Sequence, residues 1–131
     1  MAIKQAQYDL VIYRGDSKRI QMTFTNIDDV TGAEAKVDFT NLEVVLQARY
    51  QPDDPTIVFT LPFTVVGNPK DGTGYFTLKK SISEQLAAPY GQEKRTSGTY
   101  DIQFWSKLDP EVAFTPVKGN WQIQLDTTRK A

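Results

Sequence analysis

The chain has 131 residues, a formal net charge of -1, and 40% hydrophobic and 24% charged residues. This size and composition are typical of a single globular domain with a hydrophobic core and exclude a disordered chain. The sequence contains no cysteine and no histidine. We therefore exclude disulfides, cysteine nucleophiles, cysteine zinc sites and any mechanism that needs a histidine base.

The sequence also argues against membranes and nucleic acids as partners. No apolar run approaches the roughly 20 residues needed to span a bilayer. The opening residues, MAIKQAQYDL, lack the apolar centre of a signal peptide. Lysine and arginine form no basic stripe of the kind that binds nucleic acid. We expect a protein that is made and used without Sec export.

The N-terminal part predicts an arm followed by two strands. Residues 1–7 are expected to form an arm that could extend onto a neighbouring molecule, and residues 8–13 a weak strand. In the run KRIQMTFTN, polar residues alternate with Ile20, Met22 and Phe24. Successive side chains of a strand point to opposite faces, so this run predicts a half-buried strand.

The tetrapeptide RGDS, residues 14–17, lies between these two strands. Glycine and aspartate supply the backbone freedom that a chain reversal needs, and the side chain of Asp16 or Ser17 can bond nearby backbone N–H groups. The same letters occur in ligands of animal integrins, which gives an adhesion hypothesis. Because so short a motif often arises by chance, we favour the turn.

Two strands with a strong alternating pattern follow. Residues 42–50 read LEVVLQARY, and residues 56–61 read TIVFTL with Ile57 on the core face. The prolines and aspartates of residues 52–55 predict the turn that separates them. Residues 67–72 predict a further loop. It lies between two weaker predicted strands, at residues 63–66 and 74–79.

One short helix is predicted over residues 82–88. Ser81 and Glu84 match a capping box, in which a serine hydroxyl caps a backbone N–H and a glutamate three residues on reaches back. Pro89 ends the run. The polar, glycine-bounded residues 91–98 predict a surface loop.

The C-terminal part alternates again and completes the predicted fold. Residues 99–107 place Tyr100, Ile102 and Phe104 on one face. Seven to nine short strands with frequent turns predict an all-β antiparallel sandwich or barrel. The last predicted elements are a weak strand at residues 112–117, a tight hairpin at 118–120 and a strand at 120–126 with Trp121, Ile123 and Leu125 in the core.

Two acidic pairs are candidates for chemistry. The aspartates at residues 28–29 and 53–54 have the oxygen ligands that calcium prefers, and paired carboxylates also carry glycoside hydrolysis. Neither pair has the spacing of a calcium loop, and a small sandwich has little room for a deep cleft. Solvated turns are the favoured interpretation, so we predict no catalytic, cofactor or metal site.

A partner interface is predicted on the outer surface. Trp105, Val45 and Val58 lie out of phase with their core-facing neighbours, so together they could form an apolar outer patch that binds another protein. In the alternative interpretation Trp105 packs beneath a loop. Trp105 or Tyr90 could also serve as a stacking platform for host glycans.

The order of the motifs resembles a known family. RGDS precedes the first long strand, VDFT at residues 37–40 precedes the second, YDI follows at 100–102, and DTTR closes the pattern at 126–129. This order is similar to that of small phage and prophage virion proteins related to the immunoglobulin-like N-terminal domain of the siphophage baseplate upper protein. The resemblance covers residues 10–129.

The resemblance implies an immunoglobulin-like β-sandwich at residues 8–129, after the arm at 1–7. It implies a non-enzymatic protein that binds other virion structural proteins in several symmetric copies, in a particle assembled in the host cytoplasm. No helical neck or receptor-binding module follows in this sequence, so we expect an adaptor in the tail, baseplate or fibre-attachment region. A capsid decoration protein of the same fold and a host-glycan-binding module are the alternatives.

Overall fold

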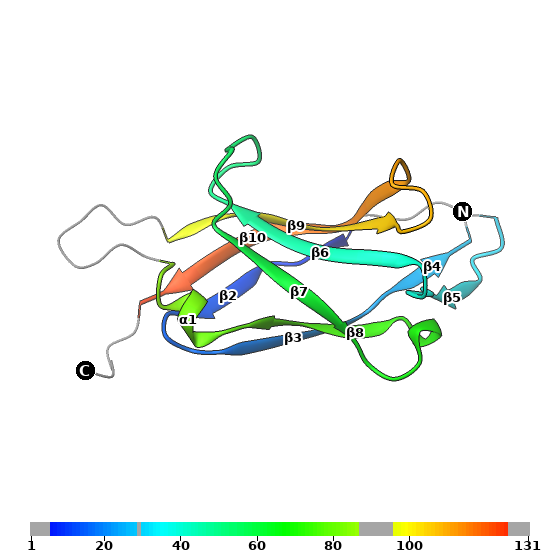
Figure 1. Cartoon of the computed structure of the whole chain (residues 1–131), viewed down its shortest axis with the longest axis horizontal. Helices are drawn as coiled ribbons and strands as arrows, with labels where there is room; N and C mark the ends of the chain where they lie inside the picture. Colours follow the sequence, from blue (N-terminus) through cyan, green and yellow to red (C-terminus); the bar gives the residue numbers. More distant parts are fainter. Residues whose placement is uncertain (1–5, 29, 87–95, 126–131) are drawn as a thin grey trace.

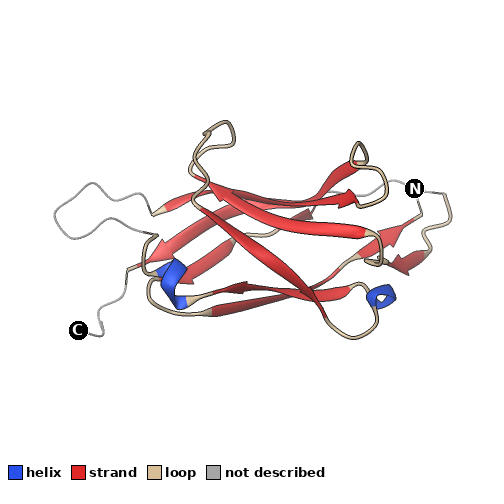
Figure 2. Ribbon diagram, in the orientation of Figure 1, coloured by secondary structure: helices blue, strands red, loops and turns tan. Residues whose placement is uncertain are grey.

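The computed structural model describes residues 6–28, 30–86 and 96–125 (Figure 1). Strands make up most of this part of the chain, with one short α-helix and one 3-10 turn (Figure 2). The helix α1 spans Lys80–Ser83, and the turn η1 spans Pro69–Asp71. The strands are β1 (Ala6–Gln7), β2 (Leu10–Tyr13), β3 (Lys18–Thr23), β4 (Thr25–Ile27), β5 (Glu34–Lys36), β6 (Leu42–Arg49), β7 (Phe59–Val65), β8 (Thr73–Leu78), β9 (Ser97–Ser106) and β10 (Ala113–Gln124).

The main sheet has eight strands in the order β1-β10-β9-β6-β7-β8-β3, with β2 also paired to β10. Strand β7 changes partner along its length, because Pro62 lies opposite β6 whereas Phe63 lies opposite β8. The sheet therefore folds into two facing layers, with β6, β9 and β10 in one and β3 and β8 in the other (Figure 1). The predicted fold class, an all-β immunoglobulin-like antiparallel sandwich with one short helix, is confirmed. The described part of the chain has ten strands, eight of them in the main sheet, where seven to nine were predicted.

The first and last strands pair in parallel. Strand β2 lies beside β10 with Leu10 opposite Trp121, and β1 lies beside the same strand with Ala6 opposite Val117. All other ladders of the main sheet are antiparallel. The last two residues of the expected N-terminal arm therefore belong to the sheet.

Aromatic rings fill the end of the core beneath β4 and β5. Phe24 packs edge-on against Phe39 and Phe104, with ring centroids 6.0 and 4.9 Å apart. Phe39 also packs edge-on against Phe63 at 5.1 Å. Such T-shaped pairs stabilise a core by about 0.5–1.5 kcal/mol each beyond their buried area. At the other end Trp121 is fully buried and donates from Nε1 to the carbonyl of Arg49 at 3.1 Å, as its predicted core position requires.

The predicted hairpin at residues 118–120 is wrong, because β10 continues through it as one strand. Gly119 does not turn the chain but allows a close approach by another backbone segment. A Cβ at this position would lie 2.0 Å from the carbonyl oxygen of Tyr8. The glycine therefore lets the N-terminal segment approach closely, and the N–H of Tyr8 donates to the carbonyl of Lys118 at 3.1 Å.

Two other predicted boundaries differ from the structure. The separate strands expected at residues 56–61 and 63–66 are one strand, β7, which begins only at Phe59. Ile57 precedes it and is 43% exposed, and Leu125 follows β10 and is 40% exposed. Alternation does not show where pairing starts and stops, so both residues were wrongly placed in the core.

The predicted helix has shifted, and the capping box is absent. Helix α1 begins after Lys79, which makes no side-chain cap. Ser81 therefore lies inside the helix, and Glu84 accepts a hydrogen bond from Lys80 Nζ instead of reaching back to a cap. The chain turns at residues 84–86 and buries Leu86. Residues 87–88 of the predicted helix lie outside the described residues.

The RGDS segment is a turn, as predicted, but Ser83 of α1 fixes it. Gly15 has a φ of 90°, which glycine adopts without strain. Its N–H donates to Ser83 Oγ at 3.1 Å, and Ser83 Oγ donates to the carbonyl of Asp16 at 2.7 Å. Among the described residues, the side chains of Asp16 and Ser17 make no hydrogen bond that would close the turn, contrary to the expectation.

Replacing Ser83 with alanine should lower the free energy of unfolding by about 1–3 kcal/mol, because it leaves partly buried backbone groups of the turn without their partner. Urea unfolding of the purified protein measures the change. Ser81→Ala is the matched control: its side chain is exposed on the same helix, and a change within about 0.5 kcal/mol is expected. An equal loss in both variants would contradict the anchoring role of Ser83.

Gly119→Ala should destabilise the fold by about 1–3 kcal/mol through overpacking against the Tyr8 carbonyl. Amide hydrogen exchange should show the loss as faster opening of β1 and β2 than of β6. Lys118→Ala removes an exposed neighbouring side chain and should leave exchange unchanged. A fully stable Gly119→Ala variant would mean that Tyr8 moves away at little cost.

Candidate functional site

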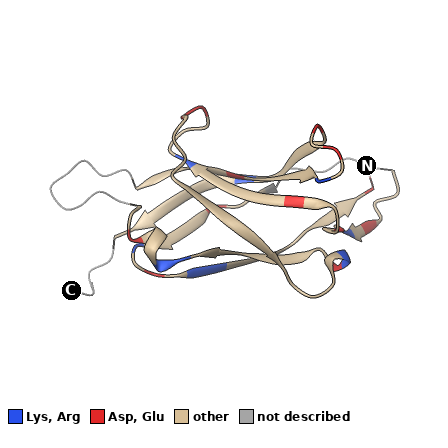
Figure 3. Ribbon diagram, in the orientation of Figure 1, with Lys and Arg blue, Asp and Glu red and all other residues tan. Residues whose placement is uncertain are grey.

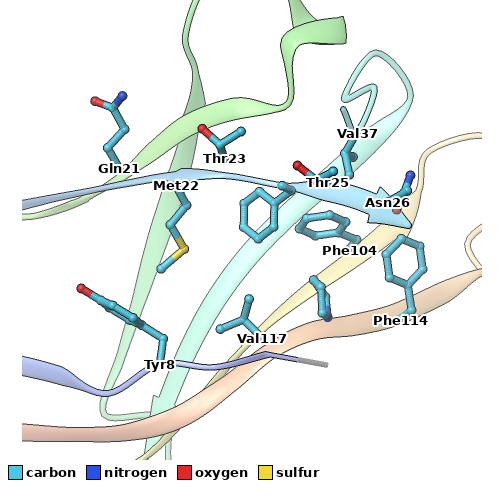
Figure 4. Close-up of a pocket in the computed structure, with 12 residues that line it drawn as sticks. Tyr8, Gln21, Met22, Thr23, Thr25, Asn26, Val37, Phe104, Phe114 and Val117 are labelled. Carbon is cyan, nitrogen blue, oxygen red and sulfur yellow. The ribbon is translucent and has the colours of Figure 1, made fainter. Parts of the chain in front are cut away.

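An apolar groove of about 440 Å³ runs between the two layers at the open side of the sandwich. We call it the seam groove. Figure 4 shows β3 and β4 along one side of it, and Tyr8 and β10 along the other. The residues lining it are Tyr8, Gln21, Met22, Thr23, Phe24, Thr25, Asn26, Val37, Phe104, Phe114, Pro116 and Val117.

Strand β3 forms one border of the groove as a free edge. The N–H of Phe24 donates to the carbonyl of Gly72 at 2.8 Å. This bond shows which residues of β3 direct their backbone groups toward β8. Backbone groups of successive residues point to alternate sides of a strand, so even-numbered residues of β3 face β8. The backbone groups of Arg19, Gln21 and Thr23 therefore face away, and no strand of the described part of the chain pairs with them.

The segment that contains β2 forms the other border. The N–H of Arg14 donates to the carbonyl of Gln124 at 2.9 Å, so the even-numbered residues face β10 and Val11 faces away. Lys18 Nζ donates to the carbonyl of Val11 at 2.9 Å and bridges the two edges near the RGDS turn. Beyond this bridge, no backbone hydrogen bond of the described residues joins the two edges, and the groove opens.

The chemistry of the seam groove is that of an uncharged, apolar surface. None of its lining residues carries a charge, and Gln21, Thr23, Thr25 and Asn26 supply polar groups at its rim. Charged residues of the described part lie elsewhere in the chain, many of them in loops (Figure 3). Without an acid or a base in the groove, the arrangement is suited to holding apolar side chains and a polypeptide backbone rather than to acid–base chemistry.

Two of the four predicted interface residues share the outer face of the other layer. Trp105 is half-buried and donates from Nε1 to Glu43 Oε2 at 2.9 Å. Val45 is also half-buried and lies two residues after Glu43 on β6. It is opposite Gln103 of β9 and Pro62 of β7. Trp105 and Val45 are therefore diagonal neighbours on one surface, and the binding of a partner there stays a prediction.

The other two predicted residues do not join this surface in the structure. Val58 packs against the hydrophobic core, and its N–H donates to the carbonyl of Ala48 at 2.7 Å. The prediction that Val58 lies on the outer patch is wrong, because the chain before β7 does not continue the alternation of the strand. Tyr90 lies outside the described residues.

A second, polar depression of about 590 Å³ lies over β6, β9 and β10. Partial burial raises the pKa of its Asp101, and the guanidinium of Arg49 opposes that rise. Burial also raises the pKa of Tyr100 well above its usual range, and the Tyr100 hydroxyl donates to the carbonyl of Tyr8. Asp101 is the only carboxylic acid among the described residues of this depression, so no acid pair forms there.

Two of the four aspartates that were weighed as metal or catalytic ligands, Asp28 and Asp54, stabilise turns, and Asp29 lies outside the described residues. Asp28 Oδ1 accepts hydrogen bonds from the N–H groups of Val30 and Thr31, and Asp54 Oδ1 accepts one from Thr56. Within residues 6–28, 30–86 and 96–125, no group of three or more acidic side chains is placed to hold a metal ion. The same part of the chain contains no helix long and apolar enough to cross a membrane.

Sequence reasoning missed the seam groove. The alternation of residues 18–26 indicated that Met22 and Phe24 face inward, and both line the groove. Nothing in that pattern shows whether a neighbouring strand covers them. The relevant fact is that residues 10–13 pair with β10 instead of β3, and pairing of strands so distant in sequence leaves no local signal.

Comparisons with known proteins give no family for this chain. No protein-family model matches the sequence, and no curated protein matches it. Among solved structures, a family 123 glycoside hydrolase from Clostridium perfringens is similar over 92% of this chain at 12% sequence identity, with a TM-score of 0.33. This chain spans 23% of the length of that enzyme. A likeness at this level carries no argument about function.

Two aspartates should make the free energy of unfolding depend on pH in the acid range. Backbone N–H groups of Val30 and Thr31 hold the pKa of Asp28 below its usual value, and the hydroxyl and N–H of Thr40 do the same for Asp38. A carboxyl group whose pKa is lower in the folded state than in the unfolded state stabilises the fold. Its contribution to the free energy of unfolding is fully present above about pH 4–5 and is lost as the pH falls through the folded-state pKa.

Unfolding by urea between pH 5 and pH 2 should therefore show falling stability, and the double variant Asp28→Asn, Asp38→Asn should show a shallower fall. Asparagine keeps the acceptor oxygen but cannot titrate. Parallel pH curves for the two proteins would show that other carboxyl groups dominate acid unfolding.

Proposed function

We propose that this chain is a non-enzymatic structural protein of a bacteriophage particle. In this proposal it acts as an adaptor in the tail, baseplate or fibre-attachment region and binds other virion proteins. The observation that carries the binding role is the seam groove, an uncharged apolar surface beside a free strand edge. A free edge and an apolar groove are the two features that bind an extended polypeptide.

Three of the four motifs that carry the phage resemblance stabilise this fold, and the fourth, DTTR at residues 126–129, lies outside the described residues. RGDS forms the turn held by Ser83. In VDFT, Val37 and Phe39 are buried, and the carboxylate of Asp38 accepts from the N–H and hydroxyl of Thr40. In YDI, Tyr100 and Ile102 are buried. Motifs with such tasks support a shared fold, and the virion role rests on that likeness.

The outer face offers a second contact surface. Trp105 and Val45 are partly exposed on neighbouring strands, and tryptophan is enriched where protein interfaces are strongest. On β2, Val11 and Tyr13 are also exposed, at 44% and 54%. A virion protein present in symmetric copies needs more than one contact surface, one for its neighbours and one for the structure beneath.

A capsid decoration protein of the same fold remains the close alternative. A module that binds host glycans is the alternative from another class, because Trp105 lies beside the carboxylate of Glu43 at 2.9 Å and so combines a ring with a polar acceptor. Glycan-array binding that Trp105→Ala abolishes and Val45→Ala preserves would favour that module.

Immunogold labelling of intact phage particles with an antibody against this protein tests the proposal, together with mass spectrometry of dissociated particles. We expect label at the tail or its tip and the protein among the particle components. Label over the head would favour the decoration protein. Absence from both intact and dissociated particles would refute a virion role.

A further inference from the structure

The polar depression over β6, β9 and β10 has a floor made of two rows of side chains that cross three strands. Residues directly opposite each other on neighbouring strands point to the same face of a sheet. The first row consists of Gln47, Asp101 and Lys118. The second row, two residues further on, consists of Arg49, Thr99 and Asn120. All six line the depression, so polar groups of three strands converge on one hollow.

A loop borders this floor. Residues 50–58 join β6 to β7 and project from the end of β6 (Figure 1), and Pro52 of this loop lines the depression. Arg49 Nη1 donates to the carbonyl of Asp54 at 2.7 Å, which ties the loop to the floor. A guanidinium has five N–H donors, and this bond uses one of them. The depression is therefore a formed hollow with a wall rather than a flat face.

The side chains on the floor are not bonded to one another. Among the described residues, no hydrogen bond uses the side chains of Gln47, Gln103 or Lys118. The carboxylate of Asp101 also accepts none, and partial burial raises its pKa. The guanidinium of Arg49 offsets only part of this rise. A ligand that donates hydrogen bonds to Asp101 would replace the water that the carboxylate has lost.

The mixture of groups argues against most classes of ligand. Pro52 and the ring of Tyr100 are the main apolar groups of the lining, so the apolar anchors of a protein interface are missing. The two cations, Arg49 and Lys118, flank a carboxylate, which is too little positive charge for a nucleic-acid backbone. One carboxylate also supplies too few oxygen ligands for a metal ion.

A sugar has the complementary chemistry. Each hydroxyl both donates and accepts, and neighbouring hydroxyls of a ring present two such groups side by side. These pairs match the two-atom ends of carboxylate, amide and guanidinium groups, which bond in a bidentate manner. The depression supplies acceptors at Asp101, donors at Arg49 and Lys118, and both kinds at Gln47 and Gln103.

From these observations we infer that the polar depression binds a glycan, with Asp101 accepting hydrogen bonds from neighbouring ring hydroxyls. Gln47 and Lys118, on either side of Asp101, bond to the hydroxyls next to these. This inference goes beyond the proposed function, because an adaptor that binds virion proteins needs no sugar site. It also names a different site from the pair of Trp105 and Glu43, neither of which lines the depression.

A glycan array probed with the purified full-length protein tests the inference. The array carries neutral and acidic oligosaccharides of bacterial and animal cell surfaces. We expect binding, and the bound oligosaccharide is then titrated into isotope-labelled protein and followed by nuclear magnetic resonance. The side-chain amides of Gln47 and Gln103 and the backbone amide of Asp101 should shift, whereas the amide of Met22 in the seam groove should not.

Three variants separate the floor from general effects. Asp101→Ala should weaken binding by about tenfold or more, because it removes hydrogen bonds to a charged group, and Gln47→Ala by about threefold or more. Gln122→Ala is the matched control, since Gln122 is exposed on the same face of β10 as Lys118 but does not line the depression. It should bind as the unchanged protein does. Equal urea unfolding midpoints would show that all three variants fold.

The other outcomes overturn the inference. An array without bound glycan would exclude a sugar site. Binding that Trp105→Ala abolishes and Asp101→Ala preserves would place the sugar on the other surface. Binding of another virion protein instead of a glycan, lost in Asp101→Ala, would make the depression a protein interface. Because the array uses purified protein, its result is distinct from presence in or absence from phage particles.

Discussion

The parallel pairing of β2 with β10 is the constraint on which the rest of the structure depends. It joins the beginning and end of the described chain, and Arg14 bonds to Gln124 where the N-terminal segment leaves the sheet. The RGDS turn must then cross from one layer to the other to start β3. Ser83 holds that crossing in place through the carbonyl of Asp16 and the N–H of Gly15.

The same pairing explains why the sandwich is open on one side. A first strand placed against β3 would have covered its edge and filled the space above Met22 and Phe24. Because β1 and β2 lie against β10 instead, β3 keeps an unpaired row of backbone groups within the described part of the chain. Free edges favour unwanted strand pairing. Arg19 at this edge is charged and its guanidinium lies 4.0 Å from the Tyr75 ring centroid, which discourages indiscriminate pairing at that point.

The surfaces of the molecule divide into areas with different chemistry. The seam groove is apolar and without charge, the depression over β6, β9 and β10 is polar, and Trp105 and Val45 lie on the outer face near one another. The carboxylates that might suggest catalysis, such as Asp28 and Asp54, accept hydrogen bonds from backbone N–H groups in turns. The apolar groove and the free edge beside it are the features on which we base the proposal of a binding role.

Alternation along the sequence was enough to predict the fold class and much of the core, including Phe24, Leu46, Ile102 and Trp121. It succeeded because the period of two follows from the geometry of a single strand. It failed at Gly119, which allows a close approach by Tyr8 rather than a hairpin, and at Ser81, which matches a capping pattern that the helix does not use. In both cases local residue preference was outweighed by contacts from a distant part of the chain.

The sequence by itself therefore determined the β-sandwich, the absence of cysteine and histidine chemistry, and the inward faces of the long strands. Only the tertiary structure decided which strands became edges, that β7 joins both layers, and that a groove remains beside β3. The physical reason is that side-chain pattern selects the buried face of each strand, whereas the choice of neighbour depends on backbone hydrogen bonds between distant residues. Every strand offers nearly the same backbone groups, so sequence pattern does not specify which strand they will meet.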